Sequence, residues 1–235
     1  MVLGLYYITK LRKGAKGEGL TFYGPEEALI AYNEGKVDIH AIINVVVKDL
    51  DKDGNIVDVM MKETSVGRVI VNEIVPAEVG YLNTIISKKS LRDIISDVIK
   101  AVGVARACEF LDGIKNLGYH MAFKGGLSFN LGDIIIPKEK EELVKRGNEE
   151  VEQIMMNYNM GFITDNERYN QVIDTWTHVN SDLSDILYKT IKNDDQGFNS
   201  VFMMLDSGAR GSKEQIRQLS GMRGLMAKPQ KAGAE

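Results

Sequence analysis

Hydrophobic residues recur in steps of three and four along two stretches in the second half of the chain. The first stripe consists of Leu143, Gly147, Val151, Ile154 and Tyr158, and the second of Val172, Trp176, Val179, Leu183 and Ile186. This spacing places each stripe on one face of a helix, and two such helices can bury their stripes against each other as an antiparallel coiled coil. The pattern therefore predicts a helical hairpin.

Residues that typically end or begin helices lie between the two stripes and indicate the tip of this hairpin. Gly161 is suited to end the first helix in a left-handed conformation. Thr164 and Glu167 have the spacing of a capping box, which satisfies free backbone donors at the start of the second helix. We therefore expect the tip near residues 162–165.

The first part of the chain shows shorter and more mixed patterns. Residues 41–50 and 56–64 read as strands, and residues 51–55 favour a hairpin turn between them. A calcium-binding loop fits poorly there, because its twelfth position is Lys62 rather than glutamate. Residues 2–8 form an apolar run that predicts a buried strand or helix.

Three helical segments are also predicted. Proline at the first helical position starts a short helix over about residues 25–34. Helical periodicity then predicts helices over about residues 90–102 and 104–117, broken at Gly103. Near the end of the chain, Ser212 and Gln215 form a second capping-box pair, which predicts a short helix over about residues 213–220.

These elements indicate an α+β fold, with a mixed domain of short strands and helices and a projecting antiparallel helical hairpin. We place the domains at residues 1–136, 137–192 and 193–235. Both ends of the chain read as cut from a longer polypeptide, because neither closes an element. At 235 residues, 44% of them hydrophobic, the chain can bury a core.

Composition limits the class of protein. The single Cys108 excludes an internal disulfide and fits a reducing, cytoplasmic setting. No apolar run approaches the roughly 18 residues of a membrane span. The net charge of −4 argues against a free-standing nucleic-acid binder, since such domains usually carry a basic surplus.

The sequence shows no constellation for catalysis or metal binding. Three scattered histidines and one cysteine do not form a nucleophile–base set, and we predict no catalytic and no metal-binding residues. His120 is interpreted as a satisfied loop histidine. Arg68 is interpreted as one half of an ordinary surface or interface ion pair.

A basic, glycine-rich segment over residues 206–229 stands out from the acidic remainder. It carries five cations, Arg210, Lys213, Arg217, Arg223 and Lys228, against two anions, Asp206 and Glu214. Such a surplus attracts anions. On composition alone, the alternative is a glycine-punctuated surface loop with a solvated basic face.

The order of residues in this segment carries a specific resemblance. It contains, in succession, Ser207-Gly-Ala-Arg-Gly-Ser212, Gln215-Ile-Arg-Gln-Leu219 and Gly221-Met-Arg-Gly-Leu-Met-Ala-Lys-Pro229. This order closely resembles the F-loop of the β′ family, the largest catalytic subunit of bacterial RNA polymerase. In that family the F-loop supports the bridge helix and the trigger loop as they close on the incoming nucleotide.

The resemblance implies a role for three arginines. Arg210 occupies the position whose arginine reaches toward the substrate triphosphate, and a guanidinium offers paired, permanently charged donors to phosphate oxygens. Arg217 and Arg223 would brace neighbouring backbone or nucleic-acid phosphates. These three residues are the expected substrate-phosphate and active-site support.

The predicted hairpin resembles the rim helices of the family's secondary channel, through which nucleotides enter and where regulatory factors dock. Tyr169, Asn170 and Asp174 would lie where some bacteria hold an alarmone nucleotide between this subunit and a docked regulator. Gln171 replaces a lysine common there, which weakens the attraction for a phosphate ligand. The alternative is that these are exposed polar residues of a helix without a ligand.

The resemblance extends over nearly the whole chain and implies an internal fragment of β′, between the catalytic aspartate motif and the bridge helix. Its partners would be the β, α, ω and sigma subunits, template DNA, RNA, nucleoside triphosphates and secondary-channel regulators, with no membrane. The parent enzyme, a nucleotidyltransferase, holds Mg²⁺ with residues outside this chain, so no cofactor is expected here and the isolated fragment should be inactive. The alternative function is a stand-alone helical-hairpin scaffold for protein docking.

Overall fold

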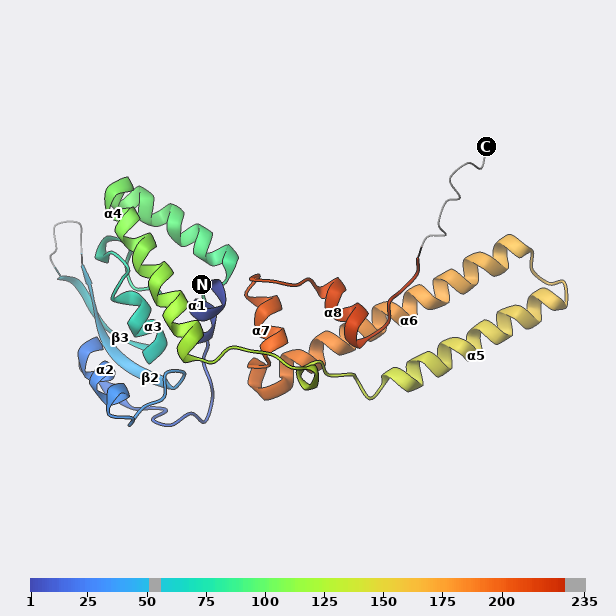
Figure 1. The fold of residues 1–235 in the computed structure, drawn as a ribbon, viewed down its shortest axis with the longest axis horizontal. Helices are drawn as coiled ribbons and strands as arrows, with labels where there is room; N and C mark the ends of the chain where they lie inside the picture. Colours follow the sequence, from blue (N-terminus) through green and yellow to red (C-terminus); the bar gives the residue numbers. More distant parts are fainter. Residues whose placement is uncertain (51–55, 227–235) are drawn as a thin grey trace. The chain divides into compact units, whose positions relative to one another are not determined.

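The computed structural model describes residues 1–50 and 56–226 (Figure 1). The chain divides into two compact units. The first comprises Met1–Phe129 and Phe202–Arg210, and the second comprises Asn130–Val201 and Gly211–Glu235. The α+β class expected from the sequence is confirmed, whereas the three domain boundaries stay a prediction.

A small mixed sheet forms one side of the first unit. Its strand order is β1 (Thr21–Phe22), β2 (Ile42–Leu50) and β3 (Ile56–Ser65), with β1 parallel and β3 antiparallel to β2. Alternate residues of β2 point into the core, because successive side chains of a strand face opposite sides. Both predicted strands are confirmed, while the predicted turn at 51–55 lies outside the described residues.

The N-terminal apolar run is a helix, α1 (Val2–Thr9), rather than a strand. Leu5 and Ile8 are completely buried, which explains a sequence without amphipathic alternation. Gly4 lets α1 approach the backbone of a later helix, since a Cβ built at Gly4 would lie 2.0 Å from the Gly118 carbonyl oxygen. The N-terminal helix is therefore a core element.

Shorter helices complete the first unit. These are α2 (Pro25–Asn33), α3 (Val66–Asn72) and the 3-10 turn η1 (Ala77–Val79). The helix predicted over 25–34 is confirmed. Ser65 caps α3 by accepting a hydrogen bond from the Arg68 backbone nitrogen.

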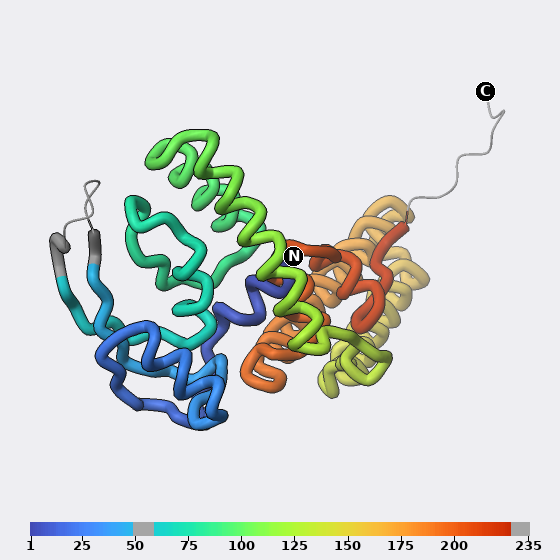
Figure 2. The backbone as a smooth tube through the Cα atoms, turned by 60° about the vertical axis from the view of Figure 1, so that its left-hand side comes forward, coloured from blue at the N-terminus to red at the C-terminus, as the bar shows by residue number. Residues whose placement is uncertain are grey.

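The longest helix, α4 (Lys88–Lys124), is broken where the sequence predicts. Gly103 adopts φ 76° and ψ 175°, and two arms meet at this kink (Figure 2). The second arm continues to Lys124, well beyond the expected end near residue 117, because Met121 is buried in the core. The interpretation of His120 as a loop residue was therefore wrong, since it is an exposed helical residue.

The second unit contains the predicted hairpin, formed by α5 (Lys140–Asn159) and α6 (Asp165–Asn193), which run antiparallel in Figure 1. Gly161 has φ 77°, and the capping box between Thr164 and Glu167 is present. Burial along the seam fades toward the tip. Leu183 is completely buried, whereas Tyr158, expected in the stripe, is 37% exposed.

The remaining elements are short. They are the 3-10 turns η2 (Leu131–Asp133) and η3 (Asp194–Gly197), and the helices α7 (Ser200–Asp206) and α8 (Lys213–Ser220). The helix α8 and its capping box are confirmed, whereas α7 was not predicted. Across the described residues, none of the helices combines the length and hydropathy that crossing a bilayer requires.

Candidate functional site

The turn after α7 presents Arg210. Ser207 is completely buried; its hydroxyl donates to the Met204 carbonyl oxygen at 3.2 Å and accepts from the Ala209 backbone nitrogen at 3.3 Å. Gly208 takes φ 72°, a left-handed conformation that glycine adopts without strain. The turn is thus defined by its own hydrogen bonds.

Hydrogen bonds attach the same turn to the rest of the first unit. The Lys88 backbone nitrogen donates to the Ser207 carbonyl oxygen at 2.8 Å. The Tyr6 hydroxyl donates to Asp206 Oδ2 at 2.6 Å, a bond between residues 200 positions apart. Through these contacts, α1 and the start of α4 hold the turn that carries Arg210.

Lys10 lies next to the Tyr6–Asp206 hydrogen bond. The residue is 8% exposed. Its ammonium nitrogen lies 3.5 Å from the Tyr6 hydroxyl oxygen and 5.0 Å from the centroid of the Phe202 ring. Burial lowers the pKa of Lys10 below its ordinary value, and the nearby Asp206 carboxylate offsets only part of this shift. A cation, a phenol and a carboxylate are therefore grouped at this point.

The Arg210 side chain itself is exposed. Within residues 1–50 and 56–226, its guanidinium forms no hydrogen bond or ion pair, and its backbone nitrogen bonds the Met204 carbonyl oxygen at 3.4 Å. A guanidinium free of internal partners can offer its donors to an external anion. The predicted phosphate-binding residue thus has an anchored backbone and an available head group.

Arg217 and Arg223 belong to the second unit. Arg217, on α8, pairs with Glu214, and its side chain is only 16% exposed. A Cβ at Gly224 would lie 3.2 Å from both terminal nitrogens of Arg217, so the following turn packs closely on this guanidinium. Arg223, on that turn, is exposed, whereas Lys228 lies outside the described residues.

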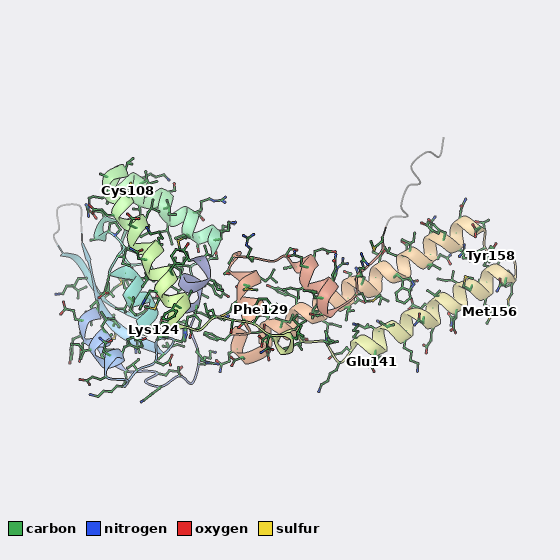
Figure 3. All side chains as sticks on the ribbon, viewed as in Figure 1. Cys108, Lys124, Phe129, Glu141, Met156 and Tyr158 are labelled. Atoms are coloured by element: carbon green, nitrogen blue, oxygen red, sulfur yellow. The ribbon has the colours of Figure 1, made fainter. Side chains whose placement is uncertain are left out.

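The alarmone candidates Tyr169, Asn170 and Asp174 are all exposed near the distal end of α6. Around them, the end of the hairpin exposes several large apolar side chains: Met155, Met156, Tyr158, Met160 and Phe162. Figure 3 shows Met156 and Tyr158 at this end of the hairpin. Phe162, at the tip, is 75% exposed.

Arg168 links the two helices at this end, a contact that sequence reasoning missed. Its terminal nitrogen donates to Asp165 Oδ1 at 2.7 Å, and its guanidinium lies 5.2 Å from the centroid of the Tyr158 ring. An arginine on an aromatic face contributes a cation–π attraction in addition to packing. This contact joins α5 and α6 near the tip, where few side chains of the seam are buried.

The structure corrects the interpretation of Arg68. The residue is 7% exposed, not at the surface, and its guanidinium donates to the Thr9 carbonyl oxygen and to both oxygens of Asn83, at 2.9–3.0 Å. Burial lowers its pKa. Arg68 therefore ties α3 to α1 and to the segment before α4.

Neither Arg68 nor the Tyr6–Asp206 bond had a sequence signal, because their partners are distant in the chain. Among the residues that the structure describes, no group of three His, Cys, Asp or Glu side chains is arranged to hold a metal ion.

Two family models match most of the chain. The family model described as RNA polymerase Rpb1, domain 3, matches residues 1–134, and that of RNA polymerase Rpb1, domain 4, matches residues 163–234. The first match covers more than half of the chain.

Curated relatives match the whole chain. It is 99% identical to the β′ subunit of DNA-directed RNA polymerase from Phocaeicola vulgatus and 87% identical to that from Bacteroides fragilis strain YCH46, each over 235 residues. It is 54% identical to the β′ subunit from Flavobacterium johnsoniae. The chain spans only 16% of the length of the first two relatives and 17% of the third.

Proposed function

Because the chain belongs to the family of the largest RNA polymerase subunit, called β′ in bacteria, we propose that it serves DNA-templated RNA synthesis as a part of that subunit. Its partners would be the β, α, ω and sigma subunits, template DNA, RNA and nucleoside triphosphates, in the cytoplasm. We propose that this part of the subunit contributes binding and positioning, with the Mg²⁺ of nucleotidyl transfer held by residues elsewhere in the subunit.

We place the nucleotide contact at Arg210. The single observation that carries this proposal is an exposed guanidinium without an internal partner, on a turn held by hydrogen bonds to α1 and α4. A planar guanidinium can bind two phosphate oxygens at once and stays charged at any physiological pH. Arg210 would bind the triphosphate of the incoming nucleotide.

Arg217 and Arg223 are proposed to brace neighbouring backbone or nucleic-acid phosphates. Arg223 is exposed and can reach such a group directly. Arg217 already pairs with Glu214 and lies under the Gly224 turn, so its main contribution would be to hold that turn in place. Substitution of Arg223 should therefore weaken phosphate binding and leave the turn in place, whereas substitution of Arg217 should also disturb the turn.

We propose that the hairpin lines the secondary channel and receives regulatory factors at its distal end. The exposed apolar side chains from Met155 to Phe162 support this role, since they gather within eight residues at one end of the hairpin, and exposed apolar groups of this kind mark interaction sites. Tyr169, Asn170 and Asp174 are exposed in the N-terminal half of α6 and are proposed to contact an alarmone held against a docked regulator. Their substitution by alanine should then reduce the alarmone's effect without changing factor-free transcription.

The test of the nucleotide contact uses Arg210→Ala and Arg210→Lys in the full-length subunit, within reassembled polymerase. Loss of a charge-assisted contact costs on the order of 1.5–3 kcal/mol, so apparent nucleotide affinity should fall roughly ten- to a hundredfold in the alanine variant. The lysine variant keeps the charge but not the fork, so it should recover part of the loss. Unchanged affinity in Arg210→Ala would remove the substrate role.

The second candidate is a scaffold whose hairpin docks a protein while the chain never touches nucleotides. The exposed Phe162 and its apolar neighbours favour this alternative. It predicts that Phe162→Ser abolishes factor binding while Arg210→Ala leaves nucleotide addition intact. The same reassembled enzymes decide between the two functions.

A further inference from the structure

The side-chain contact that attaches the Arg210 turn to the N-terminal helix comes from Tyr6, a residue that the F-loop sequence does not include. Tyr6 is 2% exposed, and its hydroxyl donates to Asp206 Oδ2 at 2.6 Å. Asp206 is exposed and ends α7, four residues before Arg210. A buried phenol thus holds a surface carboxylate at the first residue of the turn.

The anchor behind this bond is rigid. Leu5 and Ile8, on either side of Tyr6 in α1, are completely buried, and Gly4 packs against the backbone of α4 without room for a Cβ. Close-packed surroundings of this kind allow little rotation or displacement of a helix. The position of the Tyr6 hydroxyl is therefore fixed by the core of the first unit.

Lys10 reinforces the attachment. It lies one helical turn beyond Tyr6, with its ammonium 5.3 Å from the centroid of the Tyr6 ring and 5.0 Å from that of Phe202. Phe202 is itself 4% exposed and belongs to α7. The lysine therefore contacts both helices that the Tyr6–Asp206 bond joins.

We propose that the Tyr6–Asp206 hydrogen bond, supported by Lys10, positions the turn that presents Arg210 and thereby sets the nucleotide affinity of the assembled polymerase. This inference rests on the proposed function of Arg210. Tyr6, Asp206 and Lys10 are positioning residues, since their effect reaches the substrate through Arg210.

The physical reason is the geometry of a guanidinium–phosphate contact. Two parallel hydrogen bonds form only when the fork faces the phosphate oxygens, so a small displacement of the turn weakens both. Tyr6→Phe removes one hydroxyl and leaves the ring packing unchanged. The Lys88–Ser207 backbone bond remains, so the turn should shift without unfolding.

The experiment places Tyr6→Phe in the full-length subunit of reassembled polymerase and measures KM and kcat for nucleotide addition. We expect KM to rise roughly three- to tenfold, less than for Arg210→Ala because Tyr6 acts only through the position of Arg210, with kcat changed by less than about twofold. Tyr81→Phe is the matched control, because it removes a hydroxyl of the same unit that is bonded to Thr64 at 3.0 Å rather than to a residue of the turn. It should leave KM unchanged.

A double variant separates positioning from general destabilisation. In an Arg210→Ala background, Tyr6→Phe should raise KM no further, because the group that it positions is absent. An equal rise with and without Arg210 would overturn the proposal, and so would an unchanged KM in the single Tyr6→Phe variant. If Arg210→Ala alone left KM unchanged, the proposed nucleotide contact itself would be wrong. If Arg210→Ala raised KM and Tyr6→Phe did not, only the positioning role of Tyr6 would be wrong.

Substitutions of Asp206 test the bond from its exposed side, where folding is least affected. Asp206→Asn keeps an acceptor oxygen for the Tyr6 hydroxyl and should hold KM within about twofold of the unsubstituted enzyme. Asp206→Ala should match Tyr6→Phe. If the asparagine variant were as impaired as the alanine variant, the hydrogen bond would not be the positioning contact.

Discussion

The core of the first unit and the hairpin of the second are stabilised in different ways. The core cluster draws on nearly every element of its unit and leaves α1 almost without exposed side chains, with Leu5 and Ile8 completely buried. The hairpin has a narrow seam, in which Leu143, Val179 and Leu183 form a small buried cluster. At its distal end most side chains are exposed to solvent.

This difference shows where each region can tolerate change. In the first unit, long-range packing holds the backbone that carries Tyr6 and Arg210. A substitution that disturbs this packing should therefore lower the stability of the whole unit. In the hairpin, local caps and a few seam residues determine the structure, so most surface positions can serve recognition. Substitutions should therefore have large, global effects in one region and small, local effects in the other.

The largest effect is expected at Gly4. Gly4→Ser should lower the free energy of unfolding by at least about 3 kcal/mol, because its Cβ would lie 2.0 Å from the Gly118 carbonyl oxygen, a backbone atom that cannot move aside. Gly24→Ser is the matched control, since no atom lies within 4 Å of that Cβ and serine is favoured at the first cap of α2. Urea unfolding measures both, and equal stability of the two variants would contradict the close approach.

The hairpin seam comes next. Leu183→Ala should cost about 2–3 kcal/mol, because Leu183 is completely buried and truncation leaves a cavity between the helices. Leu219→Ala, on α8 in the same unit, removes the same atoms from a residue that is 68% exposed, and should change stability by less than about 0.5 kcal/mol. Thermal or urea unfolding decides, and a comparable loss in both would refute a seam concentrated at Leu183.

A smaller, local effect is expected at the cap of α6. Thr164→Ala should cost about 1 kcal/mol, since it removes the acceptor for the Glu167 backbone nitrogen. The expected signature is faster hydrogen exchange in the first turn of α6 with little change in the first unit. Thr177→Ala is the control: its hydroxyl only bonds back to the Ile173 carbonyl oxygen inside the helix, and its loss should be close to neutral.

The smallest effect concerns pH at the same cap. Hydrogen bonds from the Thr164 backbone nitrogen and hydroxyl hold the pKa of Glu167 below its ordinary value of 4.5. The unfolded turn therefore binds a proton more readily than the folded one, so this stabilisation is present above pH 4.5 and is lost as the pH falls through the lower, folded pKa. Glu167→Gln can still close the capping box and should remove this pH dependence of hydrogen exchange. Identical acid profiles in the two proteins would contradict the assignment.

The sequence predicted the elements whose signals are local. The two strands, the break at Gly103, the Gly161 terminus and the capping boxes at Thr164 and Ser212 were all confirmed, because each depends on residues within four positions. For the hairpin, the stripes predicted the pairing but overestimated burial at Tyr158, where periodicity cannot show how far a seam extends.

What the sequence could not predict depends on contacts between distant residues. The Tyr6–Asp206 bond joins positions 200 apart, and the burial of Arg68 depends on Thr9 and Asn83. The extension of α4 past residue 117 follows from the burial of Met121 and from the packing of Gly118 against Gly4 of α1. No local pattern of charge or hydrophobicity encodes these contacts.

The most direct test of the central claim compares Arg210→Ala with Phe162→Ala in the same reassembled polymerase. Apparent nucleotide affinity and regulatory-factor binding are measured for each. We expect Arg210→Ala to lower nucleotide affinity roughly ten- to a hundredfold and to leave factor binding unchanged. Phe162→Ala should weaken factor binding and leave nucleotide affinity unchanged. Intact nucleotide affinity in Arg210→Ala, or an equal loss in Phe162→Ala, would contradict the division of roles between the two regions.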